Sequence, residues 1–369
     1  MGNMWLLLVT SLWAHCRLGA AVDAIAPQLD VIPYPSEVSL GASASLVDAK
    51  TFTMSVGECS FDCDVLDRAM ERYMKTIFKA PGSTGTVFRL SIFEDRINAT
   101  IPTGDINQIS ELVIKTTTKS AVELQFGVDE SYELSVPHSS VHVFGKSTAV
   151  LTAPTVWGAL RGLETFAQIV QYQAQPEFVD ASGYFISWTP LIVKDSPRFP
   201  WRGVLVDSAR HYLTVPLLRK TVDSMATMKL NTLHWHIVDA ESFPFVSEKY
   251  PELQHKATYH PSASYSQDTI RELVVYARDR GVRVLPEFDT PGHTASVGQA
   301  YPELIADCYD WMVQHYDTNM RWPYFNNIAL DVTKEATKEF AQAVMGEMAS
   351  LFPDSFFHVS VTTLTPSIF

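Results

Sequence analysis

From residue 203 onward the chain alternates apolar, strand-like runs with amphipathic helical segments. Three of the strand-like runs end in an acidic residue: Gly203–Asp207, Thr232–Asp239 and Val282–Asp289. Strands that alternate with helices pair in parallel through right-handed crossovers, so their final residues meet at one edge of a sheet. That edge is where a (β/α)8 barrel keeps its active site. A fourth run starts at Phe356–Val359, and the pattern predicts the first half of a (β/α)8 TIM barrel.

The first half of the chain shows a different pattern, in which short strands mix with two helices. The strand candidates are rich in β-branched or aromatic residues: Val87–Phe93, Glu111–Lys115, Ala121–Phe126, Ser131–Val136 and Ser140–Phe144. Helical spacing of apolar residues marks two further segments, Cys63–Phe78 and Trp157–Val170. Prolines punctuate a connector at Pro190, Pro197 and Pro200. We therefore predict an α+β N-terminal domain over residues 28–187 and a partial (β/α)8 catalytic domain over residues 197–369.

Size and charge narrow the class of protein. A chain of 369 residues has room for about two domains. Its 46% hydrophobic residues can bury enough surface to offset chain ordering, which excludes a disordered tail. The 28 basic and 41 acidic residues give a net charge of −13. The release of counterions from nucleic acid therefore cannot drive binding to most of the surface of this protein. We expect neither nucleic acid nor anionic membranes as partners.

The N-terminus has the features of a secretory signal peptide. An apolar run over Met4–Ala14 is followed by three small residues, Gly19, Ala20 and Ala21. This pattern predicts a signal peptide over residues 1–21 and a secreted or lysosome-like destination. The alternative is a first buried strand or an uncleaved anchor, because the leading MGN has no basic residue. No later apolar run reaches about 18 residues, so we expect no stable membrane span.

The cysteines and one sequon bear on the same compartment. Removal of the leader takes Cys16 with it and leaves Cys59, Cys63 and Cys308. An odd number means that at least one thiol is free or has a partner outside this chain. Cys59 and Cys63 are close enough in sequence for either to be paired, and Cys308 is expected to be free if its partner lies in a missing part of the protein. The sequon at Asn98 predicts a glycosylated surface site.

Polar side chains cluster where the first two strands of the second half end. Arg210 follows Asp207 and has a rigid fork of donors suited to vicinal hydroxyls or a carboxylate, although a structural salt bridge with Asp207 is the alternative. On the second strand, His234 and His236 share one face, as a metal-binding pair would. Without further ligands at suitable spacing, hydrogen-bonded core histidines are favoured over zinc, so we predict no metal. Asp239, at the mouth of the strand, is the stronger functional candidate.

The third strand runs into a compact group of polar residues. Glu287 and Asp289 are followed by Pro291 and Gly292, which force a turn and direct His293 toward the mouth of the sheet. A carboxylate that holds an imidazole is a common device for orienting a polar site. The alternative, a capping or surface histidine, is weaker because the acids, the turn and the histidine lie so close in sequence.

Four segments carry a resemblance to a known family. They are Trp157–Gln168 (WGALRGLETFAQ), Arg198–Leu213 (RFPWRGVLVDSARHYL), Leu230–Phe245 (LNTLHWHIVDAESFPF) and Arg280–Thr294 (RGVRVLPEFDTPGHT). In order and in spacing they closely resemble motifs of glycoside hydrolase family 20, the β-N-acetylhexosaminidases. The resemblance runs from about Val31 to Val359 and covers the first half of the family's catalytic barrel.

The resemblance implies a function and a set of roles. It implies an exo-β-N-acetylhexosaminidase that removes terminal GlcNAc or GalNAc from glycans and needs no cofactor. By resemblance Arg210 binds hydroxyls of the terminal sugar, and Asp239 and His293 form a hydrogen-bonded pair that supports the catalytic acid. Asp289 lies in the same shell as a positioning group. Ala240 departs from the family, which often carries a second Asp there.

A larger departure follows the fourth strand. Family members carry the motif His-x-Gly-Gly-Asp-Glu at this position. Its Glu is the general acid/base, and its Asp orients the 2-acetamido group of the substrate. That group takes part in a substrate-assisted retaining hydrolysis, which is an exception to the usual two-carboxylate scheme. In this chain His358 and Val359 are followed by Ser360, and no acidic residue occurs after that position. We therefore expect a truncated chain that is inactive alone.

Two other interpretations stay open. The chain is alternatively a non-catalytic product that binds sugar weakly or associates with complete subunits, as a homo- or hetero-oligomer. A third reading is a different barrel glycosidase whose acid is Glu287 or Asp289.

Overall fold

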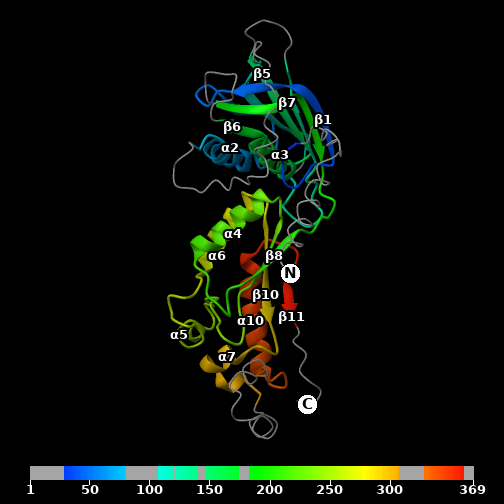
Figure 1. The fold of residues 1–369 in the computed structure, drawn as a ribbon. Helices are drawn as coiled ribbons and strands as arrows, with labels where there is room; N and C mark the ends of the chain where they lie inside the picture. The colour runs from blue at the N-terminus through cyan, green and yellow to red at the C-terminus, as the bar shows by residue number, and fades with distance from the viewer. Residues whose placement is uncertain are drawn as a thin grey trace, which may run out of the picture.

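The computed structural model describes residues 29–79, 107–119, 121–138, 146–173, 183–306 and 328–360. Within these residues the strands form two sheets, a mixed sheet of seven strands and a parallel sheet of four. Figure 1 shows the two sheets toward opposite ends of an elongated molecule. Helices α2 (Cys63–Ile77) and α3 (Val156–Ile169) lie on the side of the mixed sheet that faces the parallel sheet (Figure 1).

The mixed sheet holds the strands of the first half of the chain. Its members are β1 (Glu37–Val47), β2 (Thr53–Glu58), β3 (Asn107–Thr116), β4 (Tyr132–Val136), β5 (Lys146–Ala153), β6 (Val170–Gln173) and β7 (Gly183–Asp195). The order is β1-β3-β5-β4-β7-β6, with β2 beside β3 and an additional pairing of β1 with β7. Parallel and antiparallel pairs occur together, which confirms mixed α+β structure in this part of the chain.

Two helices fill the space under this sheet. Helix α2 was predicted from the spacing of Leu66, Met70, Tyr73 and Ile77; of these, Leu66, Tyr73 and Ile77 lie on its buried face and Met70 is partly buried. Helix α3 begins after Thr155, whose side chain accepts a hydrogen bond from the backbone of Gly158. A Cβ at Gly158 would lie 2.2 Å from the carbonyl oxygen of Ser131, so the close approach of α3 to the sheet requires glycine there.

The second half of the chain alternates strands and helices as predicted. Its strands are β8 (Gly203–Asp207), β9 (Thr232–His236), β10 (Arg283–Asp289) and β11 (His358–Ser360), all paired in parallel in the order β11-β10-β9-β8. The helices are α4 (Val215–Thr227), α5 (Glu252–Lys256), α6 (Gln267–Arg278), α7 (Ala295–Ala300), η2 (Pro302–Leu304) and α10 (Glu335–Leu351). Helices and strands share one buried core around Trp235, Phe288 and Phe340.

Two predictions in the first half differ from the structure. Residues 121–126 were predicted to form a strand, but they form none, because this segment bonds to distant parts of the chain. The Val122 carbonyl accepts a hydrogen bond from the Trp157 indole, and the Gln125 side chain bonds to Pro353 and Ser355. Pro190 is not in a connector but inside β7, where the pairing with β1 is irregular and a missing N–H is tolerated. The mixed sheet therefore reaches past residue 187.

Several predictions fall on residues that the structure does not describe. These are the signal peptide over residues 1–21, the strands Val87–Phe93 and Ser140–Phe144, the sequon at Asn98 and the thiol of Cys308. Among the described helices, none has the length and apolar character that a membrane crossing requires.

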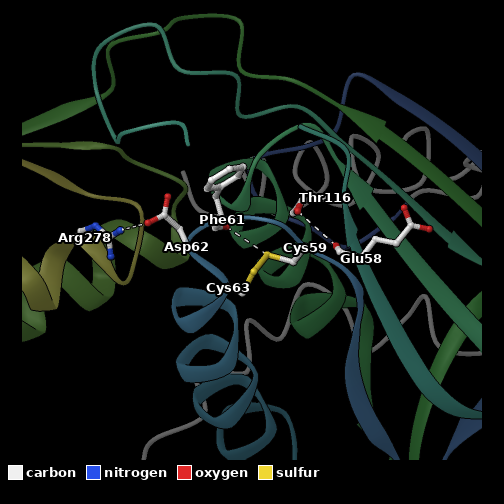
Figure 2. The surroundings of a disulfide bond; sticks show 7 residues. All are labelled: Glu58, Cys59, Phe61, Asp62, Cys63, Thr116 and Arg278. Atoms are coloured by element: carbon white, nitrogen blue, oxygen red, sulfur yellow. Dashed lines mark hydrogen bonds and ion pairs between the residues drawn. A yellow bond between two sulfur atoms is a disulfide. The ribbon is translucent and has the colours of Figure 1, made fainter. Parts of the chain in front are cut away.

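A disulfide between Cys59 and Cys63 closes the turn that leads into α2. Figure 2 shows that this turn also carries Asp62, whose carboxylate forms a 2.6 Å ion pair with Arg278 of α6. The backbone of Asp62 has a φ of 55°, in the left-handed region that L-residues rarely adopt. The disulfide therefore closes a turn whose ion pair with Arg278 connects the start of α2 to α6.

We expect Cys63→Ser to lower the free energy of unfolding by about 2 kcal/mol, the chain-entropy value for so short a closed loop. Urea unfolding with and without dithiothreitol checks this, because reduction should destabilise the parent chain and leave the variant unchanged. A variant as stable as the oxidised parent would show that the bridge contributes nothing.

Candidate functional site

The candidate site lies at the carboxyl ends of β8, β9 and β10. The pairing register places Asp207 of β8 and Glu287 of β10 on either side of His236 of β9. Asp239 and His293 follow in the turns just after these strands. The structure therefore brings together at this edge the acids that the alternating pattern predicted there, although β9 ends at His236 and Asp239 lies in the turn beyond the strand rather than at its end.

Asp239 is the most heavily hydrogen-bonded group of the site. Its side chain is fully buried. One carboxylate oxygen accepts from His236 Nε2 at 2.6 Å and forms an ion pair with Arg210 Nη2 at 2.7 Å. The other accepts from the Ala240 backbone at 2.6 Å and from His293 Nδ1 at 2.9 Å. Burial opposes ionisation, but the hydrogen bonds from His236 and His293 prevail and hold the pKa of Asp239 well below its usual range.

Arg210 lies between acids from two strands. Its guanidinium donates to Asp207 at 2.8 Å and forms an ion pair with Asp239 at 2.7 Å, while Nε lies 3.7 Å from Glu241. The salt bridge with Asp207 that sequence reasoning kept as an alternative is thus present. The side chain nevertheless remains 41% exposed, so the same guanidinium is held in place and still open to a ligand.

His293 is placed by the turn after β10. Its Nδ1 donates to Asp239 and lies 3.9 Å from Asp289, whose side chain is almost completely buried. The hydrogen bond to Asp239 raises the pKa of His293, and burial partly opposes this shift. Asp289 and His293, which were predicted to lie together, therefore both lie near Asp239. The His293 ring is closer to Asp239 than to Asp289.

A second chain of contacts runs through His236, which was predicted to be a hydrogen-bonded core histidine but without its partners. Both ring nitrogens contact carboxylates, Nε2 with Asp239 at 2.6 Å and Nδ1 with Glu287 at 2.9 Å. Glu287 also bonds to His234 at 2.5 Å and accepts from the Ser360 hydroxyl. Burial favours the neutral imidazole, but hydrogen bonds to the two carboxylates raise the pKa of His236 to about 10. The available signal was the two-residue alternation, which places these side chains on one face of neighbouring strands.

Among the residues that the structure describes, possible metal-ligand atoms lie close together in three groups. The groups are His234, Glu287 and His358; His236, Glu287 and Asp289; and Asp239, Asp289 and His293, each with ligand atoms within 4.8 Å of one another. Hydrogen bonds link members of each of the three groups or tie them to neighbouring side chains. Because these bonds account for the close approach, we assign no metal.

The His236 network predicts a pH dependence of stability. The pKa of His236 rises from 6.5 to about 10 on folding, so its contribution to the free energy of unfolding is fully present below pH 6.5 and disappears as the pH rises to about 10. Denaturant titrations between pH 6 and 10 should show this decline, and His236→Gln should remove it. The exposed His260 provides the control His260→Gln. An equal decline in His236→Gln would contradict the assignment.

Comparison with known proteins agrees with this geometry. The family model "Glycosyl hydrolase family 20, catalytic domain" matches residues 199–360, and the model "beta-acetyl hexosaminidase like" matches residues 31–169. Among solved structures, the chitobiase of Flavobacterium johnsoniae aligns with a TM-score of 0.66 and 25% identity, over 90% of this chain and 44% of that one. The β-N-acetylhexosaminidase of Streptomyces coelicolor shares the fold with a TM-score of 0.63 at 22% identity, over 89% of this chain and 59% of that one.

Curated relatives match a large part of the chain. Beta-hexosaminidase subunit A1 of Dictyostelium discoideum is 38% identical over 330 residues, which are 89% of this chain and 53% of the relative. The beta-hexosaminidase subunit beta of Homo sapiens is 42% identical over 254 residues, 68% of this chain and 41% of the relative. The chain thus spans about half the length of the curated relatives it matches. With both family models in order and relatives at this identity, the chain belongs to glycosyl hydrolase family 20.

Proposed function

We propose that this site serves an exo-β-N-acetylhexosaminidase, which removes terminal GlcNAc or GalNAc from glycans by substrate-assisted retaining hydrolysis. The observation that carries the proposal is the cluster of Arg210, Asp239 and His293 at the carboxyl ends of parallel strands in a family 20 chain. In this proposal the strand order β8 to β11 is the first half of a (β/α)8 barrel over residues 197–369, preceded by an α+β domain whose mixed sheet extends to Asp195.

Each residue takes a role that its contacts allow. Arg210 donates to the hydroxyls of the terminal sugar through its exposed edge, since Asp207 and Asp239 fix the rest of the guanidinium. Asp239 holds His293 in one tautomer through the Nδ1 hydrogen bond, which leaves the other ring nitrogen to support the catalytic acid. Asp289 positions the same ring from further away.

None of the 369 residues matches the general acid of the family. The position where the family carries its Gly-Gly-Asp-Glu motif is taken here by Ser360, which donates to Glu287, and residues 361–369 contain no carboxylate. Glu287 is a poor substitute, because burial raises its pKa less than hydrogen bonds from His234 and His236 lower it, so the side chain stays ionised. We therefore propose that the chain alone binds sugar but does not cleave it.

The disulfide supports a compartment for this activity. A Cys59–Cys63 bond persists in oxidising surroundings, such as the secretory pathway and the spaces to which it leads. We propose a secreted or lysosome-like location on this ground. Several relatives are named as subunits, which supports association of this chain with complete copies of the fold.

Titration with N-acetylglucosamine, followed by ligand-observed NMR, tests the site. We expect binding by the 369-residue chain and at least tenfold weaker binding by Arg210→Ala, because the substitution removes donors with charge assistance. Arg271→Ala, at a surface arginine of α6 paired with Asp268, is the control and should bind as the parent does. Equal binding by Arg210→Ala would remove the proposed role, and no binding by the parent would contradict a sugar site in this chain.

A further inference from the structure

Glu241 lies in the turn after β9, two residues beyond Asp239. The Asp239 backbone donates to the Ser242 carbonyl at 3.0 Å and closes this turn. Ala240 and Ser242 are buried, which fixes the backbone on either side of Glu241. The Glu241 side chain is 18% exposed and points toward Arg210, with Oε2 3.7 Å from Nε. The site therefore contains an acid to which the proposed reaction gives no role.

The carboxyl groups of Glu241 and Asp239 are close neighbours with unequal surroundings. Asp239 accepts hydrogen bonds from His236, His293 and Ala240 and forms an ion pair with Arg210. Glu241 Oε2 is buried and has no hydrogen-bond partner among the described residues, and its distance to Arg210 exceeds that of a hydrogen bond. When two carboxyl groups share a site, the proton goes to the one whose anion is less well stabilised. That group is Glu241.

The other charged groups around Glu241 favour the same distribution. Burial raises the pKa of Glu241, and the neighbouring Asp239 raises it further, while Arg210 lowers it. Tyr259 also faces this carboxyl, and its hydroxyl donates to the Arg210 backbone carbonyl at 2.7 Å. Asp207 lies beyond Arg210 and is paired with it.

We propose that Glu241 is a positioning residue for Arg210: as the neutral acid it leaves the guanidinium to its other partners, and as the anion it draws the guanidinium toward itself through Nε. The proton moves between Glu241 and solvent, and no other bond is formed or broken. In the neutral state the guanidinium is held by Asp207 and Asp239, with Nη2 also 3.3 Å from His293 Nδ1, and Nε–H is available to a ligand. In the ionised state a third acid occupies that donor.

The consequence for ligand binding rests on the proposed function. If Arg210 binds the hydroxyls of a neutral sugar, ionisation of Glu241 removes one charge-assisted donor. The affinity for N-acetylglucosamine should then fall about tenfold as the pH rises from 5 to 8, the effect of one such hydrogen bond. Glu241 would thereby favour binding under acidic conditions.

NMR of the Arg210 Nε–Hε group in the 369-residue chain tests the proposal without a ligand, with Arg210→Lys used to assign the signal. In the parent chain the signal should shift with pH in a step whose midpoint lies above 4.5, the ordinary value for glutamic acid. Glu241→Gln imitates the neutral acid and should abolish the step. Glu248→Gln, at an exposed acid of the same loop, should retain it.

The outcomes separate this proposal from the proposed function. A step that persists in Glu241→Gln, or no step in the parent between pH 4 and 8, would overturn the role of Glu241. N-acetylglucosamine titrations at pH 5 and 8 then measure the effect on sugar affinity. The affinity should fall tenfold between these pH values in the parent chain and should stay constant in Glu241→Gln. A pH step without sugar binding would contradict the sugar site and leave the positioning role supported.

Discussion

Glu130→Ala should lower the free energy of unfolding by about 3–5 kcal/mol, the cost of breaking a buried ion pair by removing one partner. The Glu130 carboxylate is 2% exposed and accepts from Arg161 at 2.7 Å and from Arg202 at 2.6 Å. It also accepts from the Asn231 amide at 2.8 Å. Burial opposes ionisation, but the charge of Arg161 and hydrogen bonds from the two arginines hold the pKa of Glu130 below its usual value.

The loss of stability should be large because the contacts of Glu130 join the two halves of the chain. Arg161 belongs to α3 and also donates to the Gly281 carbonyl at 2.7 Å, just before β10. Without Glu130, two guanidinium groups would remain against each other with no compensating charge. Urea unfolding measures the change, and Glu133→Ala is the matched control, since its ion pair with Lys194 is exposed and contributes at most about 1 kcal/mol. A loss below about 1 kcal/mol in Glu130→Ala would refute this account.

The second half of the fold was predictable because its signals are local. Each strand from β8 to β11 is a short apolar run, and each main helix shows its periodicity within one segment. Much of the mixed sheet was missed: β1, β5 and β7 are half-buried strands whose pairing depends on partners far along the chain. Residues 121–126 have strand-like composition, yet contacts with Trp157 and Ser355 determine their path. Composition alone cannot show such partners.

The candidate site divides in the same way. Asp239, Arg210 and His293 were found because acids and a turn stand at strand ends in sequence. His236 was predicted to be a hydrogen-bonded core histidine, and it is buried and hydrogen-bonded, but the sequence did not show that its partners are Asp239 and Glu287. Glu241 carried no signal, because its environment depends on the burial of its neighbours and on the position of Arg210. Residue type identifies candidates, and three-dimensional contacts determine their protonation.

The 369-residue chain should show no turnover of an aryl β-N-acetylglucosaminide between acidic and neutral pH. Replacing the sequence after Val359 with a family-type continuation from Gly-Gly-Asp-Glu onward should restore hydrolysis with retention of the anomeric configuration. In the restored protein, changing that Glu to Gln should slow the reaction by about 10²–10⁴, the usual contribution of a general acid. Restored hydrolysis requires both the new carboxylates and the group of Arg210, Asp239 and His293. The restored protein therefore also tests these three residues.

Kinetics of the restored protein assign the roles of the cluster. Asp239→Asn removes the anion that holds His293 Nδ1–H and should lower kcat more than it raises KM, because in the proposed function the pair acts in the transition state. Arg210→Ala should mainly raise KM, since in the proposed function Arg210 binds hydroxyls in the ground and transition states alike. Glu248→Gln serves as the control. Turnover by the unmodified chain that Glu287→Gln abolishes would overturn the assignment, because it would make Glu287 the acid despite its hydrogen bonds to His234 and Ser360.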